Sequence, residues 1–318
     1  MSVPIGVVVP NDLPSSEFVA YAQQAERLGF AELWVVEDCF LNGGIAQAAV
    51  ALASTSSISV GIGILPAGAR NAAFASMDIS TLAQLFPGRL LVGVGHGMPK
   101  WMRQTGTWPA SPLTLIGEYI DALRRILSGV EVSTDGRYVK LENIQLASPP
   151  RVAPPVFAGV RGPKSLAVSG RVADGTILAE PVTPEYLRAV REQVGVPRSL
   201  HEFVAYNFAA VDDSLERARD LARQSLAWIG EPDWAPHIAP LPFAEEFAAL
   251  RAQADSKESF AAQLPDEWVD QLAIVGTPEQ ARARLSELEE AGADHLVLMP
   301  AGPDPVAMLS ALGRVLQG

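Results

Sequence analysis

Short apolar segments alternate with helical segments along the whole chain of 318 residues, and this alternation strongly restricts the possible fold. The apolar segments are hydrophobic on both faces, which is typical of parallel strands that are covered on each side. Eight such segments, each followed by a helix, predict a (β/α)8 TIM barrel that forms a single domain over residues 1–318. The expected strands are residues 5–9, 33–37, 58–65, 90–94, 156–160, 176–179, 203–211 and 295–299.

The ends of three helices can be predicted from their capping residues. Serine and threonine side chains satisfy the free N–H groups of a first helical turn, and glycine allows the left-handed conformation that ends many helices. Thr277 is followed by Pro278 and, three residues on, by Gln280, as in a capping box. The expected starts and stops are Ser15 or Ser16 with Gly29, Thr183 with Gly195, and Thr277 with Gly292.

Two segments interrupt the regular alternation. Residues 131–146 carry the turn Asp135-Gly136 between two short strands, 130–133 and 138–141, which predicts a hairpin before the fifth barrel strand. Residues 227–270 hold several prolines and three tryptophans between the seventh and eighth strands. We expect this second segment to be an insertion over or beside the active-site face of the barrel.

An open doubly wound sheet is the alternative architecture. The run from Gly93 to Gly97 gives a glycine-rich loop after a strand, as in dinucleotide-binding folds. That fingerprint needs a third glycine at the start of a helix and an acidic residue about 20 residues later. Met98-Pro99 follows instead, so the match is weak and the barrel is favoured.

Charge and composition exclude several kinds of partner. The chain has 36 acidic and 24 basic residues, a formal charge of −12, which disfavours binding to nucleic acid or anionic membranes. Its four histidines form no closely spaced pair and Cys39 is the only cysteine, so no metal site and no intramolecular disulfide are expected. No run of 18 apolar residues occurs, and the N-terminus reads as a strand instead of a signal peptide. We therefore expect a cytoplasmic protein.

Candidate chemistry follows the carboxyl ends of the expected strands, where TIM barrels place their active sites. Asp38 follows the second strand, His96 and Gly97 the fourth, and Glu180 the sixth. After the fifth strand, Arg161 and Lys164 flank a glycine and a first-turn proline. A helix start beside two cations favours an anion such as phosphate, although an ordinary strand-to-helix turn gives the same pattern.

The sequence also resembles a known family. Residues 58–71, 86–97, 161–164 and 170–175 together are similar to the luciferase-like oxidoreductase superfamily, in particular to the branch that uses the deazaflavin coenzyme F420 and includes methylenetetrahydromethanopterin reductase. The resemblance covers almost the whole chain, with residues 227–270 least matched. It implies a (β/α)8 barrel and hydride transfer between the deazaflavin and a small organic substrate. An FMN-dependent monooxygenase of the same superfamily is the alternative.

The resemblance assigns roles to individual residues. Asp38 matches an acid that hydrogen-bonds the cofactor, although a rim acid paired with an arginine is the alternative. Ile62, Gly63 and Ile64 match a strand bulge with a non-prolyl cis peptide behind the deazaflavin ring, and Leu65 is the next lining position. The loop that holds the cofactor's phosphate-bearing tail is matched by Arg161, Gly162, Pro163, Lys164 and Ser165. Gly97 and Glu180, at their strand ends, are expected to contact the cofactor as well.

Departures from the family argue against a sugar-phosphate substrate. Some deazaflavin enzymes carry a histidine where this chain has Cys39, and some sugar-phosphate dehydrogenases carry a glutamate where it has Met98. His96 could exchange the proton instead, because imidazole titrates near neutral pH, or it could be a hydrogen-bonding rim residue. Cys39 has no histidine beside it in sequence, which favours a buried, inert thiol.

The sequence thus predicts an oxidoreductase with coenzyme F420, or alternatively FMN, and with His96 as the candidate catalytic residue. We expect a small-molecule substrate, no bound metal, no nucleic-acid or membrane partner, and a homodimer. A Schiff-base aldolase would need a lysine at a strand end, and none of the four lysines is expected there. A flavin-binding protein without catalytic activity stays open.

Overall fold

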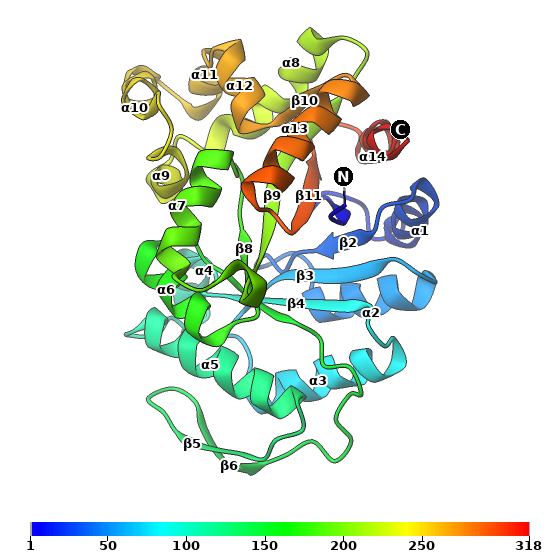
Figure 1. The fold of residues 1–318 in the computed structure, drawn as a ribbon, viewed down its shortest axis with the longest axis vertical. Coiled ribbons are helices and arrows are strands. Elements are labelled where there is room, and N and C mark those ends of the chain that lie inside the picture. The colour runs from blue at the N-terminus through cyan, green and yellow to red at the C-terminus, as the bar shows by residue number, and fades with distance from the viewer. Residues whose placement is uncertain (1, 318) are drawn as a thin grey trace.

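Eight parallel strands close into a barrel in the computed structural model, which describes residues 2–317. The sheet order is β9-β11-β1-β2-β3-β4-β7-β8, and pairing of β8 with β9 closes it. All eight expected strands are present, with ends within two residues of the prediction (Figure 1). They are β1 (Ile5–Val8), β2 (Glu32–Val35), β3 (Ser59–Pro66), β4 (Leu90–Gly95), β7 (Val156–Gly159), β8 (Gly175–Leu178), β9 (Glu202–Val211) and β11 (His295–Pro300).

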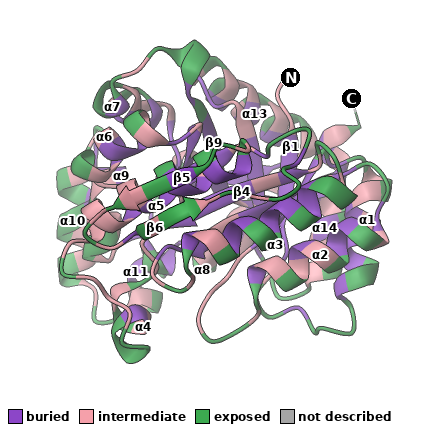
Figure 2. Cartoon of the chain, turned by 90° about the horizontal axis from the view of Figure 1, so that it is seen from below, coloured by how far each residue is buried: buried purple, intermediate pink, exposed green. Residues whose placement is uncertain are grey.

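The helices that follow the strands surround the barrel and bury one face each against it, while their outer faces are exposed (Figure 2). Most of them begin with a proline or a small residue in the first turn. They are α1 (Phe18–Leu28), α2 (Gly44–Ser54), α3 (Ala72–Leu85), α4 (Pro99–Gln104), α5 (Pro112–Leu127), α6 (Pro163–Val172), α7 (Pro184–Val194), α8 (Leu215–Ser225), α13 (Pro278–Ala291) and α14 (Pro305–Gly313). Short 3-10 turns cover Arg198–Leu200, Leu226–Trp228, Pro232–Trp234 and Arg314–Leu316.

The predicted helix ends are confirmed except at the start of α1. The Thr277 capping box is present, the Thr183 hydroxyl caps α7, and all three predicted glycine stops have the left-handed conformation. The prediction of a serine cap for α1 was wrong. The cap position is Glu17, which makes no side-chain cap hydrogen bond, because the Glu17 N–H bonds to the Pro14 carbonyl in a preceding turn.

The barrel interior is filled by large side chains that pack against glycines on the neighbouring strand. Trp34 of β2 is fully buried, and its ring lies where a Cβ on Gly61 of β3 would be, only 2.3 Å away. Phe157 of β7 fills the equivalent space beside Gly175 of β8. These pairs make the interior a packed core, so a ligand must bind above it.

The predicted hairpin is present before β7, two residues later than expected. It consists of β5 (Val132–Asp135) and β6 (Lys140–Ile144), and Asp135 pairs with Lys140 across the strands. The Glu118 carboxylate of α5 accepts hydrogen bonds from the backbone N–H groups of the turn residues 137–139. This side chain fixes the hairpin to the outside of the barrel.

The predicted insertion between β9 and β11 is a set of short helices with its own hydrophobic cluster. It contains α9 (Ala235–Ile238), α10 (Ala244–Gln253), α11 (Lys257–Ala262) and α12 (Asp266–Leu272). Phe243 stacks on Trp268 with ring centres 4.7 Å apart, and Phe247 packs edge-on to Phe260. The chain returns through β10 (Ile274–Gly276), which pairs in parallel with the end of β9. We did not predict this strand, because three residues carry too little pattern.

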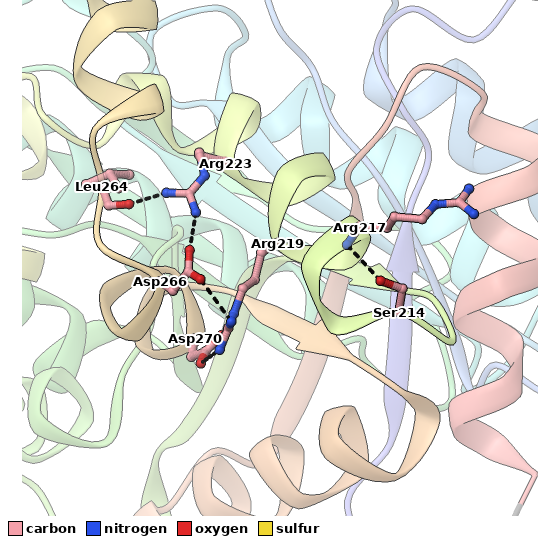
Figure 3. Close-up of polar contacts among 7 residues, drawn as sticks. All are labelled: Ser214, Arg217, Arg219, Arg223, Leu264, Asp266 and Asp270. Carbon is pink, nitrogen blue, oxygen red and sulfur yellow. Dashed lines mark hydrogen bonds and ion pairs between the residues drawn. The ribbon is translucent and has the colours of Figure 1, made fainter.

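Ion pairs connect the insertion to the barrel helix α8 (Figure 3). The guanidinium of Arg219 donates to both carboxylate oxygens of Asp270, at 2.8 and 2.6 Å, and also to Asp266 at 3.0 Å. Arg223 donates to Asp266 at 2.5 Å and to the Leu264 carbonyl. Two arginines on one helix therefore hold the start of α12 in place.

Candidate active site

A cavity of about 750 Å³ opens at the carboxyl ends of the barrel strands, where the fold class predicts the active site. Residues in or directly after all eight barrel strands line it, and the insertion adds Pro232, Asp233 and Pro236. Apolar side chains such as Trp101, Trp108 and Phe208 form much of its wall. A mainly apolar cavity with a few polar groups is typical of a cofactor or small-molecule site.

Asp38 lines this cavity, and its neighbour Glu37, not Asp38, forms an ion pair with the nearby arginine, Arg70. The Asn11 amide donates to Asp38 at 2.8 Å, whereas Arg70 makes a two-point ion pair with Glu37. Burial raises the pKa of the Asp38 carboxyl, and the Asn11 hydrogen bond partly offsets this effect. The alternative interpretation, a rim acid paired with an arginine, therefore describes Glu37 and not Asp38.

The β3 bulge is found where the resemblance implies it. The pairing register of β3 with β4 shifts between Ile62 and Leu65, and the Gly63–Ile64 peptide is cis. Gly63 and Ile64 line the cavity. Ile62 and Leu65 are buried in the core and do not line the cavity. They therefore flank the bulge and do not contact a ligand in the cavity.

Tyr206 is a cavity residue that the sequence did not reveal. Its hydroxyl lies beside Gly63, at 2.3 Å from where a Cβ would be, and it is buried without a hydrogen-bond partner among the described residues. Burial raises the pKa of this hydroxyl well above its usual range, so it stays a neutral donor. A buried donor without a partner at a cavity wall is well placed for a ligand oxygen or nitrogen.

His96 and Gly97 line the cavity from the end of β4. The Nε2 atom of His96 lies 3.1 Å from the hydroxyl of Ser165, at the start of α6. Burial lowers the pKa of the imidazole, which keeps it neutral near pH 7. Gly97 has a φ of 70°, and a side chain there would collide with Met102, so the loop requires glycine.

The predicted phosphate loop is divided between the cavity and the surface. Arg161 lines the cavity, stacks over the Trp234 ring at 4.8 Å and donates to the Asp233 carbonyl at 3.2 Å. Gly162, Pro163, Lys164 and Ser165 lie outside the lining, and Pro163 and Lys164 are exposed. No side chain caps the start of α6 at Gly162.

Glu180 lines the cavity from the end of β8, opposite the Asp38 side. Burial raises the pKa of its carboxyl, and the Asp38 charge adds to this effect while Arg161 opposes it. The cavity therefore holds two carboxyl groups that favour the protonated form more than usual.

Cys39 also lines the cavity, and it is half-buried instead of fully buried as expected. Burial and the charges of Glu37 and Asp38 raise the pKa of its thiol, so it is a poor nucleophile. Within residues 2–317 no three potential ligands are close enough to hold a metal ion. None of the helices described in this range has the length and hydrophobicity needed to span a membrane.

A TIM barrel with an apolar cavity above a β3 bulge defines the structural class, and comparison with known proteins gives the family. Residues 3–295 match the family model described as luciferase-like monooxygenase. The chain belongs to this family.

Two curated relatives match this chain over nearly its whole length. The chain is 28% identical over 323 residues to 5,10-methylenetetrahydromethanopterin reductase of Methanolobus tindarius, covering 98% of both chains. It is 28% identical over 321 residues to F420-dependent glucose-6-phosphate dehydrogenase of Kribbella flavida, covering 95% of this chain and 91% of the relative. The solved structure of the coenzyme F420-dependent tetrahydromethanopterin reductase of Methanopyrus kandleri superposes with a TM-score of 0.83 at 21% identity, over 100% and 99% of the two chains. The last comparison supports the TIM-barrel prediction.

Proposed function

We propose that this protein is an oxidoreductase that uses coenzyme F420 to transfer a hydride to or from a small organic substrate. The observation that carries the proposal is the match over 95% of this chain to a dehydrogenase that is named as F420-dependent. The cavity fits a tricyclic deazaflavin, since it is large, apolar and offers the free Tyr206 hydroxyl beside Gly63. The bound cofactor would supply the hydride chemistry, and the protein would orient the substrate and exclude water.

The proposed roles of the site residues follow from their positions. Asp38, Gly63, Ile64 and Gly97 would contact the ring system from one side of the cavity. Arg161 would face the ribityl-phosphate part of the cofactor, with Lys164 and Ser165 farther out at the start of α6. His96, neutral and at the cavity wall, would exchange a proton with the substrate.

Titration of the purified protein with coenzyme F420 and with FMN tests the cofactor assignment. The change in cofactor fluorescence should give micromolar or tighter binding for the deazaflavin and at least ten-fold weaker binding for FMN. Tight FMN binding with oxygen consumption would instead favour the monooxygenase alternative. Binding of neither cofactor would refute the proposed function.

We also propose that the protein forms a homodimer through α2 and α3. Three large apolar side chains of α3 are exposed, namely Phe74 (69%), Met77 (55%) and Leu85 (65%), and Val50 of the adjacent α2 is exposed as well. Exposed apolar side chains on neighbouring helices are typical of an interface. Analytical ultracentrifugation should show a dimer, and Phe74→Asp should convert it to a monomer, whereas a monomeric parent protein would contradict this assignment.

The single free cysteine is consistent with a reducing compartment, so we propose a cytoplasmic location.

A further inference from the structure

The turn that follows Glu180 is held by buried polar side chains from two different elements. The Asn207 amide of β9 accepts a hydrogen bond from the Val182 N–H at 2.9 Å and donates to the Val182 carbonyl at 3.1 Å. From the insertion, His237 approaches the Pro181 carbonyl with Nδ1 at 3.2 Å. Both side chains are almost completely buried, and burial of polar groups is costly unless they make such bonds. The turn after Glu180 is therefore fixed by the fold.

Glu180 itself has no hydrogen bond or ion pair with another side chain in the described part of the molecule. Arg161, the cation whose charge acts on Glu180, is engaged by the Trp234 ring and the Asp233 carbonyl instead. The Glu180 carboxyl nevertheless lines the cavity. A rigid turn that presents an unpaired carboxyl to a cavity indicates a role toward a bound molecule.

We infer that Glu180 is a catalytic acid that donates the proton to the substrate heteroatom during reduction, an assignment that rests on the proposed function. The substrate class is then an uncharged carbonyl or imine compound. The hydride would come from the reduced deazaflavin, which would be oxidised by two electrons, and its electron pair would form the new bond to the substrate carbon while the π pair of the C=O or C=N bond moves to the heteroatom. That atom takes the Glu180 proton, and the resulting carboxylate recovers a proton from the buffered solvent at the open cavity.

The surroundings of Glu180 favour its neutral, proton-carrying form. Burial is the largest influence and raises the pKa of the carboxyl, and the Asp38 charge raises it further. Arg161 acts in the opposite direction. The other groups on this side are neutral near pH 7, since burial raises the pKa of Tyr206 and lowers that of His237 to about 3. His96 is neutral as well, because burial lowers the pKa of its imidazole. A neutral imidazole is a far weaker acid than a carboxyl group, so Glu180 takes the proton-donating role that we first assigned to His96, and its carboxylate accepts the proton in the opposite reaction direction.

This role differs from the cofactor contact that we expected for Glu180, and one pair of variants separates the two. Glu180→Gln keeps the size of the side chain but cannot donate a carboxylic proton. Glu185→Gln is the matched control, because it removes a carboxylate that is partly exposed in the first turn of α7, five residues farther along the chain and outside the cavity lining. Unchanged melting temperatures show that both variants fold.

The first measurement needs no cofactor. Infrared spectra of the cofactor-free protein, recorded over a pH series, should show a protonated carboxyl band that persists above the ordinary range of glutamate in the parent and in Glu185→Gln and is absent in Glu180→Gln. A parent protein without this difference band has an ionised Glu180, and the inference would be overturned.

The second measurement is binding of coenzyme F420 and turnover of a panel of ketones, aldehydes and cyclic imines. Glu180→Gln should bind the cofactor within three-fold of the parent and should lower kcat for every compound that is reduced by about 10²- to 10⁴-fold. A more than ten-fold loss of cofactor affinity makes Glu180 a cofactor ligand and refutes the acid role. Failure of the parent protein to bind F420 refutes the proposed function instead, so the two failures are distinguishable.

Discussion

Raising the pH from about 6 to about 10 should destabilise the folded protein through a single buried histidine at the opposite end of the barrel from the cavity. His295 is the first residue of β11, and its Nδ1 atom lies 2.6 Å from a carboxylate oxygen of Glu32. Its Nε2 atom lies 3.5 Å from the Glu202 carboxylate. Glu32 and His295 are nearly buried, with side chains 4% and 12% exposed, so solvent screens this contact only weakly.

The two carboxylates raise the pKa of His295 from 6.5 to about 9, against the opposing effect of burial. Each pKa unit corresponds to about 1.4 kcal/mol, so the charged histidine contributes about 3 kcal/mol to the free energy of unfolding. Because the pKa is raised in the folded state, this contribution is complete below about pH 6.5 and is lost as the pH rises through about 9. For a barrel of this size, such a loss is a substantial part of the total stability.

The assay is urea unfolding, followed by tryptophan fluorescence, of the parent protein and of His295→Gln across this pH range. The glutamine variant keeps a hydrogen-bond donor but has no charge to lose. The difference in unfolding free energy between the two proteins should fall by about 3 kcal/mol from pH 6 to pH 10. Taking this difference cancels the contribution of titrating groups that the substitution does not affect. Histidine NMR signals provide a direct check, since only one of the four imidazoles should still be protonated at pH 8.

Two results would refute this reasoning. One is a constant difference between the parent and His295→Gln over the whole range, which would mean that the charge of His295 contributes nothing. The other is the absence of a protonated histidine at pH 8. Either would show that burial outweighs the two carboxylates at this position.

Three further predictions concern the cavity and the core. Asp38→Ala should weaken deazaflavin binding about ten-fold at an unchanged melting temperature, and an unchanged dissociation constant would remove Asp38 from the site. Lys164→Ala should weaken binding of the intact cofactor by about ten-fold at low salt and by less at high salt, because salt screens this exposed charge. An equal loss of affinity for a cofactor fragment that lacks the phosphate would mean that the phosphate binds elsewhere. Gly61→Ala should lower the free energy of unfolding in urea by about 3 kcal/mol or more, because its Cβ would overlap the ring of Trp34. The control Gly43→Ala has open space around it and should stay within about 1 kcal/mol of the parent; an equal loss in both variants would refute the overlap argument.

The sequence was informative about the fold where hydrophobic patterns were long. Each barrel strand is mostly apolar on both faces, and such runs identify parallel strands without any long-range information. The start of α1 could not be predicted from the serines, because a turn stabilised by the Pro14 carbonyl uses the residues before the helix. β10 was missed for a similar reason, since its pairing with the end of β9 is set by the path of the insertion and not by its three residues.

The candidate site was predictable only as far as strand ends identify it. Asp38, His96, Arg161 and Glu180 all follow barrel strands, and the closed barrel brings them to one cavity. Tyr206 lies inside an apolar strand, where the pattern does not show that its hydroxyl reaches the cavity wall without a partner.

The position of the Arg161 side chain could not be predicted either. It depends on Trp234, which is distant in sequence and belongs to the insertion. The roles assigned through the family resemblance stay predictions until binding is measured.

The insertion has a consequence for how such an enzyme can change during evolution. Residues 227–270 pack around their own aromatic cluster and are attached to α8 by ion pairs, yet they supply one wall of the cavity through Pro232, Asp233 and Pro236. The opposite wall is made by the strand ends of the barrel. A lineage can therefore exchange one wall for another of different shape while the barrel and its folding stay intact. Trp234 and His237 of this segment also hold Arg161 and the turn after Glu180, so a replacement wall would have to keep these two contacts.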